Sequence, residues 1–296
     1  MTTDDHASLS TGGSPLEGGV LFRLAAFTTT PDGGNPAGVW VGKTMPSDAA
    51  MQRIAADVGY SETVFAVPRA SGELDVRYFS PLAEVPFCGH ATIALGAALG
   101  TSGHTMKHHP IHTMNGLVGL DVTLDADGIV ASLSSVTPDH RNAPHDLVQT
   151  ALALLGWSDE DLDDTIAPAI AFAGANHLIL AVHRREVLAA MRYDFDDMQR
   201  LMADHGLTTL QLVWRESDTV FHVRDPFPVG GVVEDPATGA AAAALGGYLR
   251  SVGLVTPPVR LTLHQGADLG RPSELTVDVP VGSGGISVSG SVVAMR

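Results

Sequence analysis

Apolar residues recur along the chain with two different periods. In residues 51–59, MQRIAADVG, they stand at positions i, i+3, i+4 and i+7, and residues 198–206, MQRLMADHG, repeat the start of this stripe. This spacing predicts two amphipathic helices, because it places the apolar side chains on one helix face. Ser47 is a plausible N-cap of the first helix, and Gly59 and Gly206 are suited to left-handed C-caps.

Most other apolar runs are short and often alternate with polar residues, which predicts strands. These runs cover residues 21–29, 38–42, 62–67, 75–81, 116–136, 177–182, 209–214, 219–226, 260–266, 274–281 and 285–295. The turns DADG at 125–128 and GSGG at 282–285 separate pairs of strands as hairpin turns do. The alanine-rich segments 88–100 and 238–253 predict two further helices, which can be apolar all round only if sheet encloses them.

The order of these elements is repeated in the two halves of the chain. The amphipathic helices share six identities in nine positions at an offset of 147 residues, and the alanine-rich helices align at an offset of 150. We therefore predict an internal duplication and an α+β fold, not a doubly wound Rossmann sheet. The predicted parts are a disordered tail at 1–18, a first half-domain at 19–136 that gains a strand from 285–296, and a second half-domain at 137–284.

Charge and composition exclude several classes of partner. The formal net charge is −16, with 17 basic and 33 acidic residues, so the protein should repel nucleic acid and anionic membrane surfaces. No stretch reaches the roughly 18 apolar residues that a membrane helix needs. One cysteine cannot form an internal disulfide, and the first eighteen residues lack the basic and apolar regions of a signal peptide. These features predict a cytoplasmic protein.

The starts of the two alanine-rich helices are candidate binding sites for a small anionic metabolite. The first N–H groups of a helix lack intrahelical partners and carry partial positive charge. If the two halves pack face to face, both helix starts would line one cleft. The residues at these starts are Cys88, Gly89 and His90 in the first half, and Asp235, Thr238 and Gly239 in the second.

Four segments resemble the motifs of PhzF-like proteins, in the same order and at similar spacings. They are GGNPAGVW at 33–40, SETVFAV at 61–67, EVPFCGHAT at 84–92 and EDPATGAAAAAL at 234–245. The resemblance covers essentially everything after about residue 20. It implies a diaminopimelate-epimerase-like fold with two pseudo-symmetric halves, each an antiparallel β-barrel-like sheet around a central α-helix. It also implies a homodimer and a cofactor-free isomerase, since PhzF itself moves a proton on a dihydro-hydroxyanthranilate in phenazine biosynthesis.

The resemblance also assigns roles to individual residues. Glu62 matches the acid/base glutamate of the family, and His90 and Asp235 match polar positions that contact substrate. Gly239 matches the second helix start. Ala240 departs from the pattern, because the family often has a serine directly after Thr-Gly. The missing hydroxyl puts the particular substrate of PhzF in doubt for this chain.

The number of thiols separates two related chemistries. Epimerases and racemases of this fold typically oppose two cysteines, whereas this chain has only Cys88, with Thr238 at its duplicate position. A single carboxylate, Glu62, can instead remove a proton and return it to another carbon, and its duplicate is Thr209. This asymmetry favours an isomerase. The alternatives are an epimerase that uses Cys88 with a non-thiol second acid, and a non-catalytic small-molecule-binding homologue.

Each candidate also has a purely structural interpretation. Cys88 is a typical small buried residue, Glu62 a strand-end carboxylate and His90 a helix cap. Asp235 suits a turn or an N-cap, and Asn35 suits either a turn or a support for the loop beneath the site. The histidines of KHHPIH at 107–112 have no regular ligand spacing, and no phosphate-binding glycine motif is present. We therefore predict no metal site and no cofactor.

Overall fold

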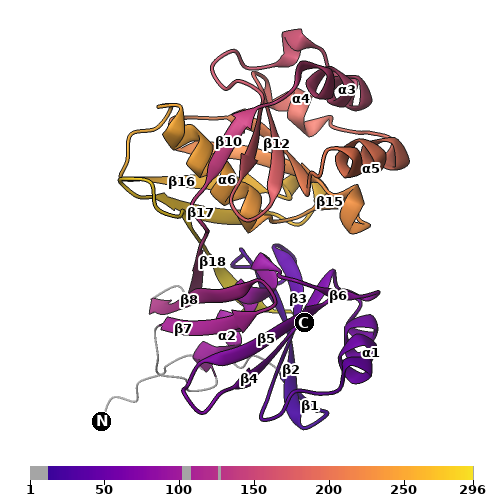
Figure 1. Ribbon diagram of the computed structural model, residues 1–296, viewed down its shortest axis with the longest axis vertical. Coiled ribbons are helices and arrows are strands. Elements are labelled where there is room, and N and C mark those ends of the chain that lie inside the picture. Colours follow the sequence, from indigo (N-terminus) through magenta and orange to yellow (C-terminus); the bar gives the residue numbers. More distant parts are fainter. Residues whose placement is uncertain (1–12, 102–107, 126–127, 296) are drawn as a thin grey trace. The chain divides into compact units, whose positions relative to one another are not determined.

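The computed structural model divides into two compact units. It describes residues 13–101, 108–125 and 128–295. The first unit takes the chain up to Pro31, then Pro36–Ala131 and the chain from Ser291, and the second takes Asp32–Asn35 and Ser132–Gly290. Each unit holds one of the alanine-rich helices among its strands (Figure 1). None of the helices in the described ranges is long and apolar enough to cross a membrane.

Strands dominate the first unit. Its elements in chain order are β1 (Ser14–Leu16), β2 (Gly19–Ala26), β3 (Asn35–Gly42), α1 (Asp48–Val58), β4 (Glu62–Pro68), β5 (Leu74–Phe79), β6 (Glu84–Val85), α2 (Gly89–Thr101), β7 (His108–Thr113), β8 (Gly116–Asp125) and β9 (Gly128–Ser134). The boundary between the units falls inside β9 and directly after the first residue of β3.

The second unit repeats this plan with additional helices. Its elements are β10 (Asp139–Asn142), α3 (His145–Leu155), β11 (Ala169–Phe172), β12 (Asn176–Val182), α4 (Arg185–Ala189), α5 (Phe195–Asp204), β13 (Thr209–Arg215), β14 (Val220–Pro226), β15 (Glu234–Asp235), α6 (Gly239–Ser251), β16 (Val259–Gln265) and β17 (Ser273–Val279). The last strand, β18 (Ser287–Ala294), begins in the second unit and ends in the first, where it pairs with β2. Three single-turn 3₁₀ helices lie at Asp159–Asp161, Pro228–Gly230 and Ala267–Leu269.

Strand pairing confirms the predicted α+β fold with two pseudo-symmetric halves. In the first unit β3 pairs with β4, β4 with β5, β5 with β6 and β7, and β7 with β8. The second unit shows the same succession from β12 to β17. The sheets differ from the predicted antiparallel ones, because β3–β4, β5–β7, β12–β13 and β14–β16 are parallel pairs. A helix lies between the partners of each parallel pair, and such a crossover returns the chain in the same direction.

The two alanine-rich helices are buried, as predicted. In α2 every residue from His90 to Leu99 is buried, and in α6 every residue from Ala241 to Leu249 is buried. Gly96 and Gly246 stand at equivalent positions, 150 residues apart. A Cβ on Gly96 would lie 2.7 Å from the Cβ of Ala131, and one on Gly246 would lie 2.9 Å from Val277 Cγ1. Both helices therefore lie closer to their sheets than a residue larger than glycine would permit at these two positions.

The predicted caps of α1 are confirmed. The Ser47 side chain accepts a hydrogen bond from the Ala50 N–H, and Gly59 closes the helix in a left-handed conformation with φ of 71°. At the end of α5, Gly206 is also left-handed, with φ of 62°, and follows the C-cap residue His205. These contacts satisfy groups that a helix end otherwise leaves unpaired.

The predicted disordered tail at 1–18 is too long, because β1 begins at Ser14 and pairs with β2. Glu17 and Gly18 form the two-residue turn with φ of 50° and 79°, the conformation of a type I′ hairpin. The Trp40 indole N–H donates to the Leu16 carbonyl at 2.8 Å and anchors the hairpin. The rest of the predicted tail, residues 1–12, and the centre of the predicted DADG turn lie outside the described residues.

A buried histidine should make the stability of the second unit depend on pH. His177 is fully buried on β12, with Nδ1 2.8 Å from Thr209 Oγ1, and Nε2 has no hydrogen-bond partner within the described residues. Burial lowers the pKa of this imidazole from 6.5 to about 3. Below about pH 6.5 the unfolded chain therefore binds a proton that the folded chain does not. The free energy of unfolding should fall as the pH drops from about 6.5 towards 3.

The close approach at Gly96 predicts the effect of adding one methyl group. Gly96→Ala should lower the free energy of unfolding by about 1–3 kcal/mol, because the overpacking outweighs the better helix propensity of alanine. Gly100→Ala in the same helix is the control, since its nearest contact would be an ordinary 3.4 Å to Ile129 Cδ1. Urea unfolding monitored by circular dichroism measures both. Equal stability of the two variants would contradict the close packing.

His177→Asn tests the origin of the pH dependence. The wild-type protein should lose up to about 1.4 kcal/mol of unfolding free energy per pH unit from this one proton, and the variant should lack that contribution. Urea unfolding at several pH values between about 7 and 4.5 gives both curves. Parallel curves would show that His177 does not titrate as its burial requires.

Candidate active site

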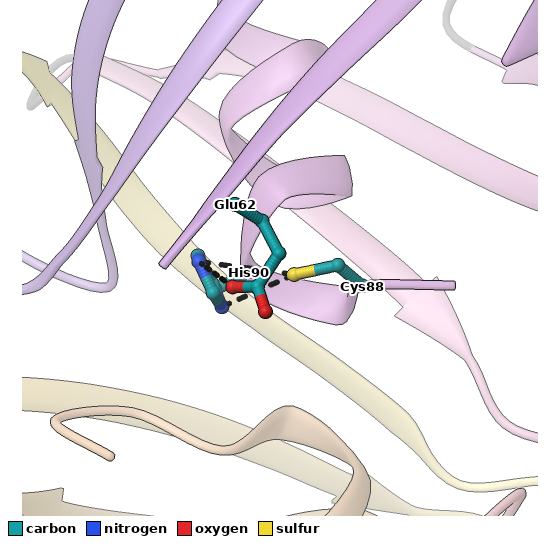
Figure 2. A group of neighbouring side chains, drawn as sticks. All are labelled: Glu62, Cys88 and His90. Atoms are coloured by element: carbon teal, nitrogen blue, oxygen red, sulfur yellow. Dashed lines mark hydrogen bonds and ion pairs between the residues drawn. The ribbon is translucent and has the colours of Figure 1, made fainter. Parts of the chain in front are cut away.

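The structure brings Glu62, Cys88 and His90 together at the start of α2. His90 Nε2 lies 3.4 Å from Glu62 Oε2. Cys88 Sγ lies 3.3 Å from His90 Nδ1 and 3.7 Å from Nε2. Figure 2 shows the carboxylate and the thiol on the same side of the imidazole, with dashed lines joining them to its nitrogen atoms. The side chains of His90 and Glu62 are 7% and 16% exposed, so this group is largely shielded from water.

Strand register explains why these residues meet. Thr63 pairs with Phe79, so the end of β5 lies beside the start of β4, where Glu62 stands. β6 then turns back along the end of β5, and the chain enters α2 at Gly89 shortly after. An added Cβ at Gly89 would meet no atom within 4 Å, so the backbone at this helix start has open space beside it.

A buried hydrogen-bond chain fixes the backbone at Cys88. The Thr92 N–H and hydroxyl both donate to the Cys88 carbonyl, at 3.1 and 2.7 Å. Because the Thr92 hydroxyl donates there, the Tyr78 hydroxyl at 2.7 Å donates to Thr92 Oγ1. Burial raises the pKa of Tyr78 far above its ordinary value, so the phenol stays neutral and can act as this donor.

The remaining predicted site residues form a second group, in the second unit. The side-chain amide of Asn35 donates to Asp235 Oδ1 at 2.7 Å and to the Ala237 carbonyl at 3.0 Å. The Thr238 hydroxyl donates to Asp235 Oδ2 at 2.6 Å. Gln265 binds on both sides of this group, because its amide donates to the Asp235 carbonyl and its oxygen accepts from the Thr238 N–H. Asn35 therefore positions Asp235, which is more than a turn-forming role.

At the equivalent positions the second unit lacks the carboxylate, thiol and imidazole of the first. At the position equivalent to Glu62 stands Thr209, whose hydroxyl is held by His177. Gly239 begins α6 as Gly89 begins α2, and the next residue is Ala240 where α2 has His90. Thr238, the duplicate of Cys88, donates its proton to a carboxylate and so does not present an acid to a ligand.

Residues 24–296 match the family model described as phenazine biosynthesis-like protein. The chain belongs to this PhzF family. A relative from Pseudomonas chlororaphis, trans-2,3-dihydro-3-hydroxyanthranilate isomerase, is 31% identical over 84% of this chain and 86% of the relative. An uncharacterized isomerase from Deinococcus radiodurans is 33% identical over 88% and 86%, respectively. The predicted isomerase class is thus confirmed: the chain is a PhzF-like isomerase.

A solved structure of the family shares the fold. A PhzF-family phenazine biosynthesis protein from Bacillus anthracis superimposes with a TM-score of 0.83 at 24% identity, over 93% of this chain and 96% of that one. At this level of identity the similarity concerns the fold. The predicted diaminopimelate-epimerase-like class agrees with it.

Several polar residues that surround this PhzF-like helix start were not predicted from the sequence. Ser61 Oγ lies 3.4 Å from His90 Nε2, and its place directly before Glu62 was the available signal. Tyr78 and Thr92 stand inside apolar runs, where a hydroxyl needs a partner. Because Thr92 stands four residues after Cys88 on one helix face, its contact with that carbonyl could have been expected.

Buried charges near Asp235 were also missed. Arg224 forms a bidentate ion pair with Glu234, and its guanidinium also donates to the Leu188 and Ala189 carbonyls. Asp225 is fully buried, and burial raises the pKa of its carboxyl well above the ordinary value, with Asp235 and Glu234 adding to the rise. The signal was a charged pair before proline at two strand ends, RDP at 224–226 and EDP at 234–236.

Among the described residues, one group of side chains has three metal-ligating atoms within 4.8 Å of one another, and it consists of Glu62, Cys88 and His90. The KHHPIH segment behaves differently. His108 pairs with Asp121 and His112 with Glu73, two separate carboxylates, and residue 107 lies outside the described residues. The arrangement at α2 therefore combines a carboxylate, an imidazole and a thiol at a positive helix end.

Proposed function

We propose that this PhzF-like isomerase shifts a proton between two carbons of a small, carboxylate-bearing metabolite derived from an amino acid, without a cofactor, and that Glu62 is the acid/base. The burial of Glu62 and its contact with His90 support this proposal most directly. Its carboxylate is largely buried at the start of an enclosed helix, 3.4 Å from His90, and its duplicate position holds Thr209. At this position one half of the duplicated fold thus has an acid and the other has a threonine.

The proposed reaction needs one residue for both proton transfers. The Glu62 carboxylate removes a proton from one carbon, and the electron pair left behind spreads over the adjacent double bond. The protonated carboxyl then returns the proton to the far carbon, so that the double bond moves and no net charge changes. N–H groups at the start of α2, near Gly89, stabilise the negative charge that develops in between.

The neighbouring groups orient this chemistry. His90 lies within reach of the Glu62 carboxylate and of any polar substituent beside it, and Cys88 Sγ lies 3.3 Å from His90 Nδ1. In the second unit, Asn35 and Thr238 hold the Asp235 carboxylate in one orientation. We propose that Asp235 is a second polar binding group, which accepts a hydrogen bond from an ammonium or hydroxyl group of a small molecule at the start of α6, next to the N–H groups at Gly239.

The substrate is expected to differ from that of the named relative. The Pseudomonas chlororaphis protein is an isomerase of trans-2,3-dihydro-3-hydroxyanthranilate. Ala240 follows Thr238-Gly239 here, so the hydroxyl that the family often carries at this point is missing. A substrate that needs no hydroxyl partner at this helix start fits the chain better.

A second candidate is an epimerase in which Cys88 supplies or removes one proton. The contact of Cys88 Sγ with His90 Nδ1 favours it, because an imidazole can take the thiol proton. Thr238, however, donates its hydroxyl to Asp235, so the duplicate position supplies no second acid. Chiral analysis of the product separates the two, since an epimerase inverts one carbon and an isomerase moves a double bond.

Glu62→Gln tests the proposed acid/base. The assay uses trans-2,3-dihydro-3-hydroxyanthranilate and a panel of unsaturated cyclic amino acids, followed by proton NMR. On any substrate that the wild-type protein converts, the variant should lose about 10²- to 10⁴-fold in kcat, because an amide cannot carry the proton. The melting temperature should change little, since the carboxylate lies at a strand end.

Glu73→Gln is the matched control. Glu73 pairs with His112 at 2.8 Å, the same kind of contact as Glu62 with His90, but on the surface of the same unit. It should keep wild-type kcat. Near-normal turnover by Glu62→Gln would remove Glu62 from the proposed role.

A further inference from the structure

The side chains at the start of α2 offer three different metal-ligand atoms. Glu62 supplies an oxygen, Cys88 a sulfur and His90 a nitrogen, and the three atoms lie within 4.8 Å of one another. Nε2 of His90 is 3.4 Å from the carboxylate oxygen and 3.7 Å from the sulfur. Figure 2 shows the carboxylate and the thiol together on one side of the imidazole.

These separations are close to those of a tetrahedral zinc site. Zinc binds cysteine sulfur at about 2.3 Å and histidine nitrogen or carboxylate oxygen at about 2.0–2.2 Å. With tetrahedral angles, neighbouring ligand atoms then stand roughly 3.4–3.6 Å apart. The separation of Nε2 from the carboxylate oxygen, 3.4 Å, matches these values. The sulfur lies 3.7 Å from Nε2 and 3.3 Å from Nδ1, so the Cys88 side chain must rotate towards Nε2 to receive the ion.

We propose that Glu62, Cys88 and His90 bind a Zn²⁺ ion, and that the bound ion switches off the isomerase. Thiolate and imidazole ligands select zinc over Mg²⁺ and Ca²⁺, which prefer oxygen alone. The three side chains leave one tetrahedral position open for water. The ion would bind the Glu62 carboxylate, which the proposed reaction needs as its acid/base. The inhibition by zinc therefore rests on the proposed function, whereas the binding does not.

The surroundings of the three ligands support this site. A proton on His90 Nδ1, facing Cys88 Sγ at 3.3 Å, leaves Nε2 free to bind the ion. Thr92 and Tyr78 hold the backbone of Cys88 through buried hydrogen bonds. Such outer contacts orient metal ligands and strengthen binding. The low exposure of the group reduces competition from water.

The described residues contain no second group of this kind. At the equivalent positions of the second unit, Thr209, Thr238 and Ala240 provide neither a thiol, nor an imidazole, nor a carboxylate. Histidine–carboxylate pairs occur elsewhere, as at His112 with Glu73, but without a third ligand atom close by. We therefore expect one tight zinc site per chain.

Metal titration of the purified full chain tests the binding, independently of any substrate. Zn²⁺ affinity is measured by competition with a chromophoric chelator, and Co²⁺ serves as a spectroscopic probe. One equivalent of Co²⁺ should produce a thiolate-to-cobalt charge-transfer band in the near ultraviolet. Because binding displaces the thiol proton, the Zn²⁺ affinity should rise with pH.

Three variants and one control locate the site. Cys88→Ala, His90→Gln and Glu62→Gln should each weaken Zn²⁺ binding by about 100-fold or more, since removing a ligand costs at least as much as removing an outer contact. His112→Gln should keep wild-type affinity. Absence of the cobalt band, or equal Zn²⁺ affinity in the wild-type protein and in Cys88→Ala, would overturn the site.

Inhibition is measured separately, on a substrate that the wild-type protein converts. Zn²⁺ should abolish turnover over the same concentration range in which it binds, and a chelator should restore it. Zinc that binds at this site without inhibiting would overturn the proposed switch. If no substrate is converted, the proposed function fails while the titrations still decide the zinc site.

Discussion

The fold depends on enclosing two helices that have no polar face. Residues His90–Leu99 of α2 and Ala241–Leu249 of α6 are buried, so sheet must surround each helix. Gly96 and Gly246 permit that close approach. In an enclosed helix, only the first turn has backbone N–H groups without intrahelical partners. The polar side chains around Glu62 and those around Asp235 lie at these two helix starts. The position of the site thus follows from the packing of the core.

Divergence of the two halves gives the site its chemistry. The strand pairings are duplicated, yet Glu62, Cys88 and His90 correspond to Thr209, Thr238 and Ala240. The first unit keeps groups that can move a proton or bind a metal. The second keeps a hydrogen-bonded network around Asp235, in which Asn35 and Gln265 hold the carboxylate and its backbone. One shared backbone plan therefore supports two different helix starts.

Features with a local signal could be predicted from the sequence. The caps Ser47 and Gly59 follow from short-range rules, and the enclosed helices follow from their composition. The hairpin at Glu17 could not be predicted in this way. Its left-handed φ of 50° is unusual for a residue other than glycine, and it depends on the hydrogen bond from Trp40 that anchors the hairpin. The contact of Asn35 with Asp235 joins residues 200 positions apart, and no periodic pattern records it. Only the family resemblance predicted that Glu62 and His90 belong to one site. Strand register brings the two residues together, and no local pattern in the sequence records that register.

In the proposed reaction one carboxylate carries the proton from one carbon to another. The most direct test of this transfer uses substrate deuterated at the carbon that loses the proton, converted in ordinary water under single-turnover conditions and analysed by mass spectrometry. Because Glu62 is largely buried, part of the deuterium should reappear at the new carbon of the product. A product without deuterium above background would contradict return of the proton by a single residue.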